Sequence, residues 1–274
     1  MATPMSRSPD RLASATVLVG LLASFLSPAS DALAGAWTLE KGTGQVIGTF
    51  LYSNSPRGFD DKGKVVNIDD YTKAEFSLLM EYGLTSDLTV ILTPSFRHAS
   101  IGDISSSSRL GYTDLGARYR IFQKDGTVLS LQGLARIPGS RRDDILANVG
   151  NTDTEYDVRG LFGHSFKIFE KDAFVDAQAG YRYRTNDPAN ELRLDGTLGV
   201  RPHPDLLLLA QTFNTISVSD PQGVFSKTRE HKLQLSAVFD INESVSFQVG
   251  GLGTVHGKNA LRERGVFSGV WIRF

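Results

Sequence analysis

The sequence predicts an all-β protein: a transmembrane, antiparallel, up-and-down β-barrel of about 12 strands that follows a cleaved signal peptide. Three observations predict it. Polar and apolar residues alternate with period two through most of residues 44–274, which is the period of a strand and not of a helix. Short turns alternate with longer polar loops along the chain. After the N-terminus, no apolar run is long enough to form a membrane-spanning helix.

The composition excludes several classes of function. Lys and Arg number 29 against 30 Asp and Glu, so the formal net charge of -1 gives no cationic surface for nucleic acid. The 274 residues include no cysteine, which excludes disulfides, cysteine zinc sites and thiol nucleophiles. We also expect no metal and no cofactor, because the histidines are dispersed and no dinucleotide-binding motif is present.

The N-terminal 34 residues have the organisation of an export signal. Arg7 and Arg11 precede the apolar run 15–26, and Ala32-Leu33-Ala34 forms a cleavage site before Gly35. A single anchoring helix is the alternative, but the apolar run is too short to span a bilayer. The predicted organisation is therefore a signal peptide (1–34), a short periplasmic segment (35–43) and an outer-membrane barrel (44–274).

The strands of the barrel follow from the alternation. It is clearest in 72–84, 114–121, 175–184, 191–198 and 230–239, where charged residues share one face and apolar residues the other. The remaining strands are expected near 44–55, 87–100, 127–138, 154–168, 205–218, 245–256 and 262–274. The apolar run 206–209 leaves the facing of its strand open.

The lengths of the connections predict how the barrel is oriented in the membrane. Short turns are expected near 85–87, 123–126, 170–172, 202–205 and 242–244, and longer loops near 56–71, 101–111, 139–153, 186–190, 219–229 and 257–261. An even number of strands places both termini on the periplasmic side, with the longer loops outside. A soluble periplasmic sandwich is the alternative, but its connections need not alternate in length.

The polar face of the strands is expected to line the lumen. The candidate transport residues are Glu75, Arg118, Arg120, Asp176, Arg182, Arg184, Arg193, Asp195 and Lys232. With Arg201, the arginines of 175–184 and 191–201 predict a positive ladder on one wall, since neighbouring strands bring them together. The leading hypothesis is a passive channel for small polar or anionic solutes. The alternative is a lumen closed by its own salt bridges, because twelve strands lie between filled and open barrels.

Two other motifs give weaker evidence of a function. His98-Ala99-Ser100 places a histidine and a serine on one face, as a lipid hydrolase would need, but no residue to orient the base is evident. The acidic stretch 60–70 contains carboxylates that could bind divalent cations, but no ligand spacing is matched. We therefore expect a protein that is not an enzyme.

Several stretches resemble known families. Residues 265–274, which end in Phe274, resemble the C-terminal strand of bacterial outer-membrane proteins. That resemblance implies that the outer-membrane assembly machinery recognises a C-terminal signal that includes Phe274. Residues 35–38, 81–85, 111–118 and 175–182 resemble XagA-like barrels linked with exopolysaccharide and biofilm. The Glu81-Tyr82-Gly83-Leu84-Thr85 turn is also similar to that of outer-membrane barrels of aromatic-degradation (MetA) pathways.

These resemblances imply a location and partners. We expect the outer membrane of a Gram-negative bacterium, contact with lipid and lipopolysaccharide, and a small solute or polysaccharide as the transported or bound molecule. The alternative function that they imply is a structural or accessory role in exopolysaccharide export or surface attachment.

Overall fold

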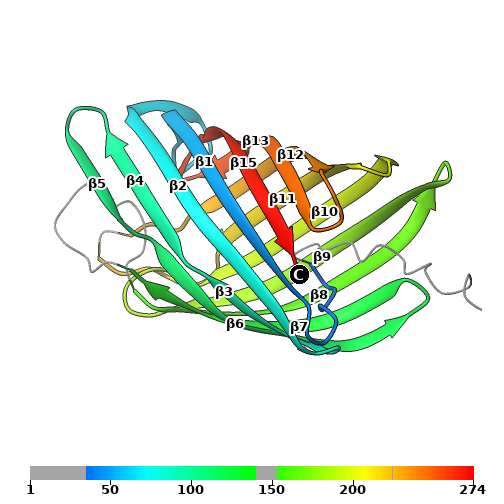
Figure 1. The fold of residues 1–274 in the computed structure, drawn as a ribbon. Helices are drawn as coiled ribbons and strands as arrows, with labels where there is room; N and C mark the ends of the chain where they lie inside the picture. The colour runs from blue at the N-terminus through cyan, green and yellow to red at the C-terminus, as the bar shows by residue number, and fades with distance from the viewer. Residues whose placement is uncertain (1–34, 140–152, 224) are drawn as a thin grey trace, which may run out of the picture. The chain divides into compact units, whose positions relative to one another are not determined.

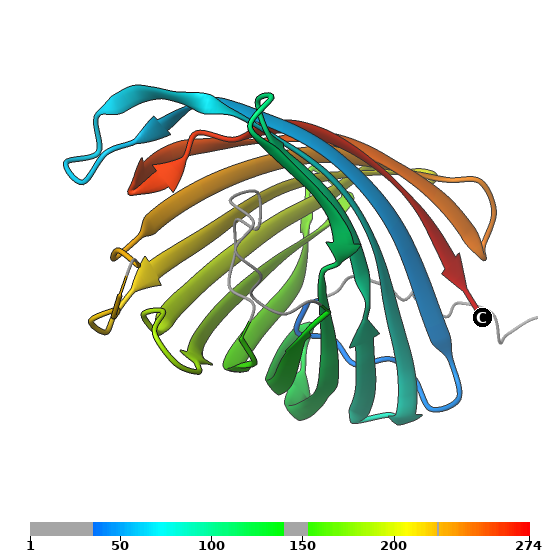
Figure 2. The same cartoon turned by 90° about the vertical axis from the view of Figure 1, so that its left-hand side faces the viewer.

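The computed structural model describes residues 35–139, 153–223 and 225–274. They form one antiparallel sheet of strands β1 to β15, and β1 (Gly44–Phe59) pairs with both β2 (Val65–Thr85) and β15 (Arg264–Arg273). The sheet therefore closes on itself as a barrel (Figure 1, Figure 2). Within the described residues, no helix is long and apolar enough to cross a membrane.

The 15 strand segments make a barrel of 12 strands. Segments β3 (Leu88–Thr93) and β4 (Ser95–Ile101) are halves of one strand, interrupted at Pro94, which has no N–H to donate to the sheet. Segments β5 (Ser105–Leu110) and β6 (Tyr112–Lys124) form another strand, and the short β14 (Ala260–Leu261) precedes β15. The others are β7 (Thr127–Pro138), β8 (Glu155–Ile168), β9 (Lys171–Arg184), β10 (Glu191–His203), β11 (Leu206–Ser217), β12 (Arg229–Asp240) and β13 (Val245–Lys258).

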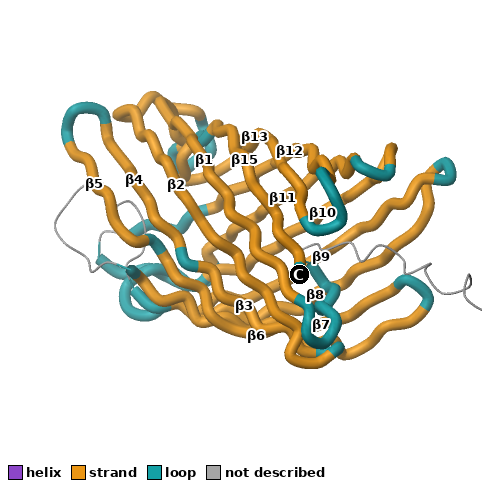
Figure 3. Tube along the Cα trace, in the orientation of Figure 1, coloured by secondary structure: helices purple, strands orange, loops and turns teal. Residues whose placement is uncertain are grey.

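The predicted short turns are present (Figure 3), but two of the predicted longer loops, 56–71 and 101–111, are tight connections at 60–64 and 102–104. Asp125 and Gly126 form a two-residue turn with φ of 48° and 77°, values that suit the right-handed twist of the flanking strands. At the other end, the predicted loop 56–71 is mostly strand, because β1 and β2 extend to a tight tip. There the Asp60 carboxylate accepts the N–H groups of Lys64 and Lys62 at 2.8 and 2.9 Å, which lowers the pKa of Asp60. The signal peptide and most of loop 139–153 lie outside the described residues.

The outer face of the barrel is apolar. Exposed side chains repeat at every second position around the sheet, namely Phe76, Leu115, Leu131, Val158, Tyr181, Leu194, Leu235, Val249 and Val266. A closed sheet pairs its backbone N–H and C=O groups internally, so such a belt can face hydrocarbon without unsatisfied polar groups. The predicted fold, a 12-stranded outer-membrane barrel, is confirmed.

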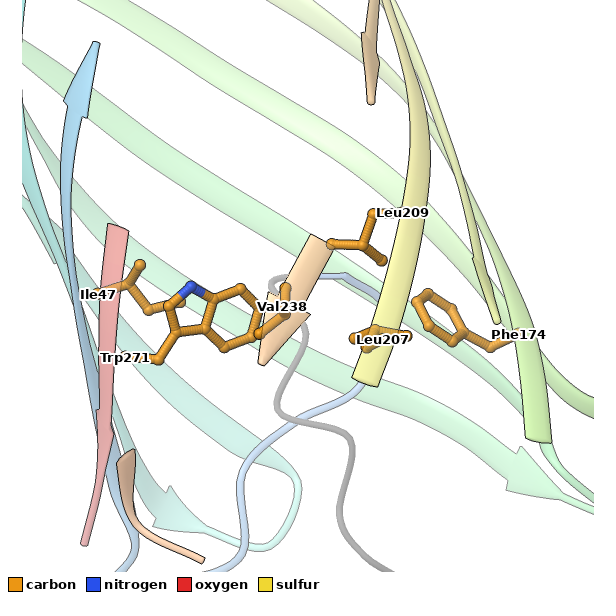
Figure 4. Packing of buried hydrophobic residues seen from close by; sticks show 6 residues of the cluster. All are labelled: Ile47, Phe174, Leu207, Leu209, Val238 and Trp271. Carbon is orange, nitrogen blue, oxygen red and sulfur yellow. The ribbon is translucent and has the colours of Figure 1, made fainter. Parts of the chain in front are cut away.

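The structure also settles the facing of the apolar run 206–209. Leu208 is exposed on the outer face, whereas Leu207 and Leu209 are buried inside the barrel. They form an internal cluster with Ile47, Phe174, Val238 and Trp271 (Figure 4). The barrel therefore has an apolar core within its lumen, which alternation of polar and apolar residues does not predict.

Candidate functional site

The candidate site is the barrel lumen, and its most charged part is the inward face of β7–β10, here named the charged wall. Asp157 is fully buried between two arginines. Its Oδ1 lies 2.7 Å from Arg159 Nε and its Oδ2 lies 3.0 Å from Arg182 Nη2. The antiparallel register places Asp157 directly opposite Arg182, which explains the contact.

The same pattern extends to the other arginines of the charged wall. Arg184 lies 3.1 Å from Glu155 and 2.8 Å from Glu191. Arg136 lies 3.1 Å from Glu155, and Arg193 Nη1 lies 3.6 Å from Glu191. These arginines are interleaved with carboxylates, so the network neutralises most of their charge.

The predicted positive ladder is therefore wrong. Arg182, Arg184 and Arg201 pair with acids from strands that the prediction did not include, whereas Arg193 pairs with Glu191 of its own strand. Glu155 and Asp157 come from β8, on the far side of β9 from β10. Arg201 pairs with Asp240 of β12, at 2.7 Å. The prediction considered only β9 and β10, and so it did not include the carboxylates that β8 and β12 supply.

Two smaller polar clusters lie elsewhere in the lumen. Arg118 Nη2 lies 2.8 Å from Glu81, which also accepts a hydrogen bond from Gln45. Glu263 lies between Lys73 at 2.8 Å and Lys232 at 2.7 Å. Sequence reasoning missed Glu263, although its position between the outward Arg262 and Arg264 places it inward.

Between the Lys232–Glu263 pair and the Arg201–Asp240 pair, the inward face of β11–β13 with β15 and β1 is uncharged. We name it the glutamine wall, after Gln211, Gln234 and Gln248. Gln234 donates to Gln211 at 2.9 Å, and Trp271 Nε1 donates to Gln248 at 3.1 Å. These amides border a cavity of about 230 Å³, which is also lined by Phe174, Phe267 and Trp271. The cavity therefore presents aromatic rings and amide groups together, with one carboxylate, that of Asp176, also in its lining.

The chain preceding β1 enters the lumen. The N–H of Ala36 donates to Asp176 at 2.7 Å, and its C=O accepts a hydrogen bond from Ser130. Arg118 Nη1 donates to the Trp37 carbonyl at 2.8 Å. The Trp37 ring packs edge-on against Phe174, with centroids 5.7 Å apart.

Residues 35–39, the start of the expected periplasmic segment 35–43, lie inside the lumen, and the periplasmic location itself stays a prediction. Ala36 has an exposed fraction of 0%. Asp176 and Ser130 bond its backbone, and Phe174 packs against the neighbouring Trp37 ring. Room for that ring comes from Gly163, where an added Cβ would lie 2.6 Å from Trp37. We name residues 35–39 the N-terminal plug; they narrow the end of the barrel that carries the short turns.

The predicted candidates lie inside the barrel, but they belong to different clusters. Asp176 and Arg118 hold the plug, Arg182, Arg184, Arg193 and Asp195 belong to the charged wall, and Lys232 pairs with Glu263. Glu75 pairs with Arg97, and Arg120 with Asp87 near the short turns. Their part in transport stays a prediction.

Phe274 lies where the barrel closes. Its backbone exchanges hydrogen bonds with Gly44, at 2.7 and 2.9 Å. An added Cβ on Gly44 would lie 2.5 Å from the Phe274 ring, so only glycine leaves room for that ring. Recognition of Phe274 by the assembly machinery stays a prediction.

The hydrolase motif does not form a catalytic pair. His98 Nδ1 lies 2.7 Å from Ser108 Oγ, while Ser100 Oγ lies 2.5 Å from Thr72 Oγ1. Among the described residues, no group of three or more metal-ligating side chains is placed to hold a metal ion.

Comparisons with known proteins agree with this architecture. Residues 40–274 match the family described as "Putative MetA-pathway of phenol degradation". No curated protein sequence matches the chain. The fold is similar to an outer membrane channel from Pseudomonas putida F1, with a TM-score of 0.70 at 16% identity, over 88% of this chain and 99% of that chain.

Two further solved structures share the fold more distantly. The translocator domain of the autotransporter NalP from Neisseria meningitidis has a TM-score of 0.51 at 11% identity, over 86% of this chain and 90% of that one. The KdgM porin has a TM-score of 0.50 at 10% identity, over 82% and 99% respectively. At these identities the likeness concerns the fold.

Proposed function

We propose that this chain, which belongs to the MetA-pathway phenol-degradation family, is a passive outer-membrane channel for small polar solutes, phenol-like aromatics among them. The observation that carries the proposal is the cavity at the glutamine wall. Its rings can stack on a flat apolar solute, and its amides can bond a hydroxyl group without demanding a charge.

The electrostatics support neutral over strongly charged solutes. Because acids and arginines alternate on the charged wall, a passing ion meets little net field there. Hydrogen-bonding groups that line a pore select by size and bonding pattern as well as by charge. The small cavity and the plug together favour small molecules.

Solute flux through the refolded mature barrel tests this proposal. In liposomes, phenol efflux should exceed that of protein-free liposomes, and replacing both Gln211 and Gln248 by Leu should reduce it. Matched vesicles with Gln123→Leu, at the barrel rim, should behave as wild type. If neither the wild type nor a variant with a displaced plug passes solute, the barrel is closed and structural.

The resemblance to XagA-like barrels supports a second candidate, an accessory role in exopolysaccharide export or attachment. A polysaccharide would then bind the outer rim, since the plug narrows the lumen. Loss of surface polysaccharide in a deletion strain, restored by a chain with a blocked lumen, would favour this role over transport. No catalytic role is proposed.

A further inference from the structure

Four basic residues form two facing pairs on the outer surface of β12 and β13. The register places Arg229 opposite Lys258 and His231 opposite His256. The two imidazole rings stack, with centroids 5.9 Å apart and an angle of 22°. We name these four residues the basic patch.

Facing cations weaken a sheet, so the basic patch needs an explanation. Like charges directly opposite each other destabilise an antiparallel pair, and Arg229 and Lys258 are in that position. Within the described part of the chain, neither has a carboxylate within 4.0 Å. An anion that lies between the two cations would remove the repulsion.

The nearby acids are engaged elsewhere. Glu230 points into the lumen, where it lies 3.2 Å from Lys232. Asp220 pairs with Lys227 at 2.5 Å. The Asp60 carboxylate accepts two backbone N–H groups at the tip of the β1–β2 hairpin. The basic patch is thus left for an anion from outside the chain.

The hydrogen bonds of His231 leave one ring nitrogen available. Asn214 Nδ2 donates to the Leu194 carbonyl and to Thr212 Oγ1, which turns its Oδ1 toward His231. His231 Nδ1 lies 2.7 Å from that Oδ1 and therefore donates to it. Because Nδ1 carries one proton, His231 Nε2 can donate a hydrogen bond to a ligand oxygen only when the ring is doubly protonated.

The position of the basic patch selects the ligand. Along β12, the outward row runs from Phe239 through Leu235 and Leu233, which are exposed and apolar, to His231 and Arg229. The cations thus begin where the lipid-facing row ends, at the end of the barrel with the longer loops. In an outer-membrane barrel that end faces outward, so the anions at this level are lipid headgroups of the outer leaflet.

We infer that the basic patch is a binding site for the phosphate groups of the lipid A part of lipopolysaccharide. Arg229 and Lys258 supply the charge, and His231 and His256 supply hydrogen bonds to phosphate oxygens. The site rests on the outer-membrane location and not on channel activity, so the two can fail separately.

Lipid binding to the refolded mature barrel in detergent tests the inference. Native mass spectrometry would compare bisphosphorylated lipid A with fully dephosphorylated lipid A. Each basic side chain at an anionic lipid surface is worth about fivefold in affinity, so the R229Q/K258Q double variant should bind lipid A about 25-fold more weakly. Inorganic phosphate at millimolar concentration should not displace the lipid, because the acyl chains also contribute.

A matched control removes two exposed cations from the opposite rim. The K124Q/K171Q double variant should bind lipid A as the wild type does, and Arg229→Lys should keep most of the affinity. All variants must show the gel shift between unboiled and boiled samples that marks a closed barrel. Equal binding of dephosphorylated lipid A, or unchanged binding by R229Q/K258Q, would overturn the inference.

Discussion

Gly163→Ala should open the channel by displacing the N-terminal plug. Gly163 lies on the inward face of β8, beneath the Trp37 ring. An added Cβ would lie 2.6 to 2.9 Å from three ring carbons of Trp37, well inside contact distance. The ring must therefore move away from β8, and its edge-on contact with Phe174 must change.

The expected size of the effect follows from the cost of overpacking. An extra methyl group in a packed site costs about 1–3 kcal/mol. Here that cost falls on the docked plug, because the β8 backbone is fixed by pairing with β7 and β9 on both sides. The equilibrium between docked and displaced plug should shift by about 5- to 150-fold.

Planar-bilayer recordings can measure this shift. The fraction of time in wide openings should rise by that factor in Gly163→Ala, and Trp37→Ala should raise it as well. Gly160→Ala is a matched control on the same strand, because no atom lies within 4 Å of its added Cβ. It should record as wild type.

Two results would refute the reasoning. Recordings of Gly163→Ala that match those of Gly160→Ala would show that the plug does not control conductance. A loss of folding in Gly163→Ala, seen as a missing gel shift, would show that β8 yields before the plug does. Trp37→Ala leaves the wall unchanged and so tests the plug in that case.

Three further predictions concern the barrel. Asp157→Asn leaves two buried arginines without their shared carboxylate, so unfolding should become easier by about 3–5 kcal/mol, measured as a lower temperature for loss of the gel shift. Replacing Arg182 and Arg193 by Glu should shift the reversal potential toward cation selectivity; an unchanged potential would place the conduction path elsewhere. Cysteine at Asp61 should be labelled from outside intact cells and cysteine at Asp125 should not, and labelling at Asp125 would invert the topology.

The sequence predicts the barrel well because strand facing is a local property. One residue in two must face lipid, so alternation identifies both faces without knowledge of neighbouring strands. It fails where both faces are apolar, as at Leu207 and Leu208, because the lumen contains an apolar cluster. It also fails at β5, because most of the predicted loop 101–111 is a strand of serines and arginine that pairs with β4.

The plug could not be predicted from the same pattern. Its residues make contacts with β6, β7 and β9, which are distant along the chain. Ala36 uses its backbone for these bonds, and a backbone group carries no sequence signature. Gly163, which leaves room for the Trp37 ring, is the one signal of the plug in the strand sequences named above, but an inward glycine on a strand is equally consistent with a bulge.

Selectivity is the property that most depends on contacts across several strands. Taken alone, β9 and β10 carry Arg182, Arg184 and Arg193 inward and suggest an anion pathway. The structure inserts Glu155 and Asp157 from β8 into that array, and the lumen charge becomes local pairs instead of one extended field. A solute then meets a sequence of dipoles along the charged wall and amides and rings on the glutamine wall. Such a lumen discriminates by size and hydrogen bonding before it discriminates by charge, which is why a neutral aromatic alcohol is a sharper test than a salt.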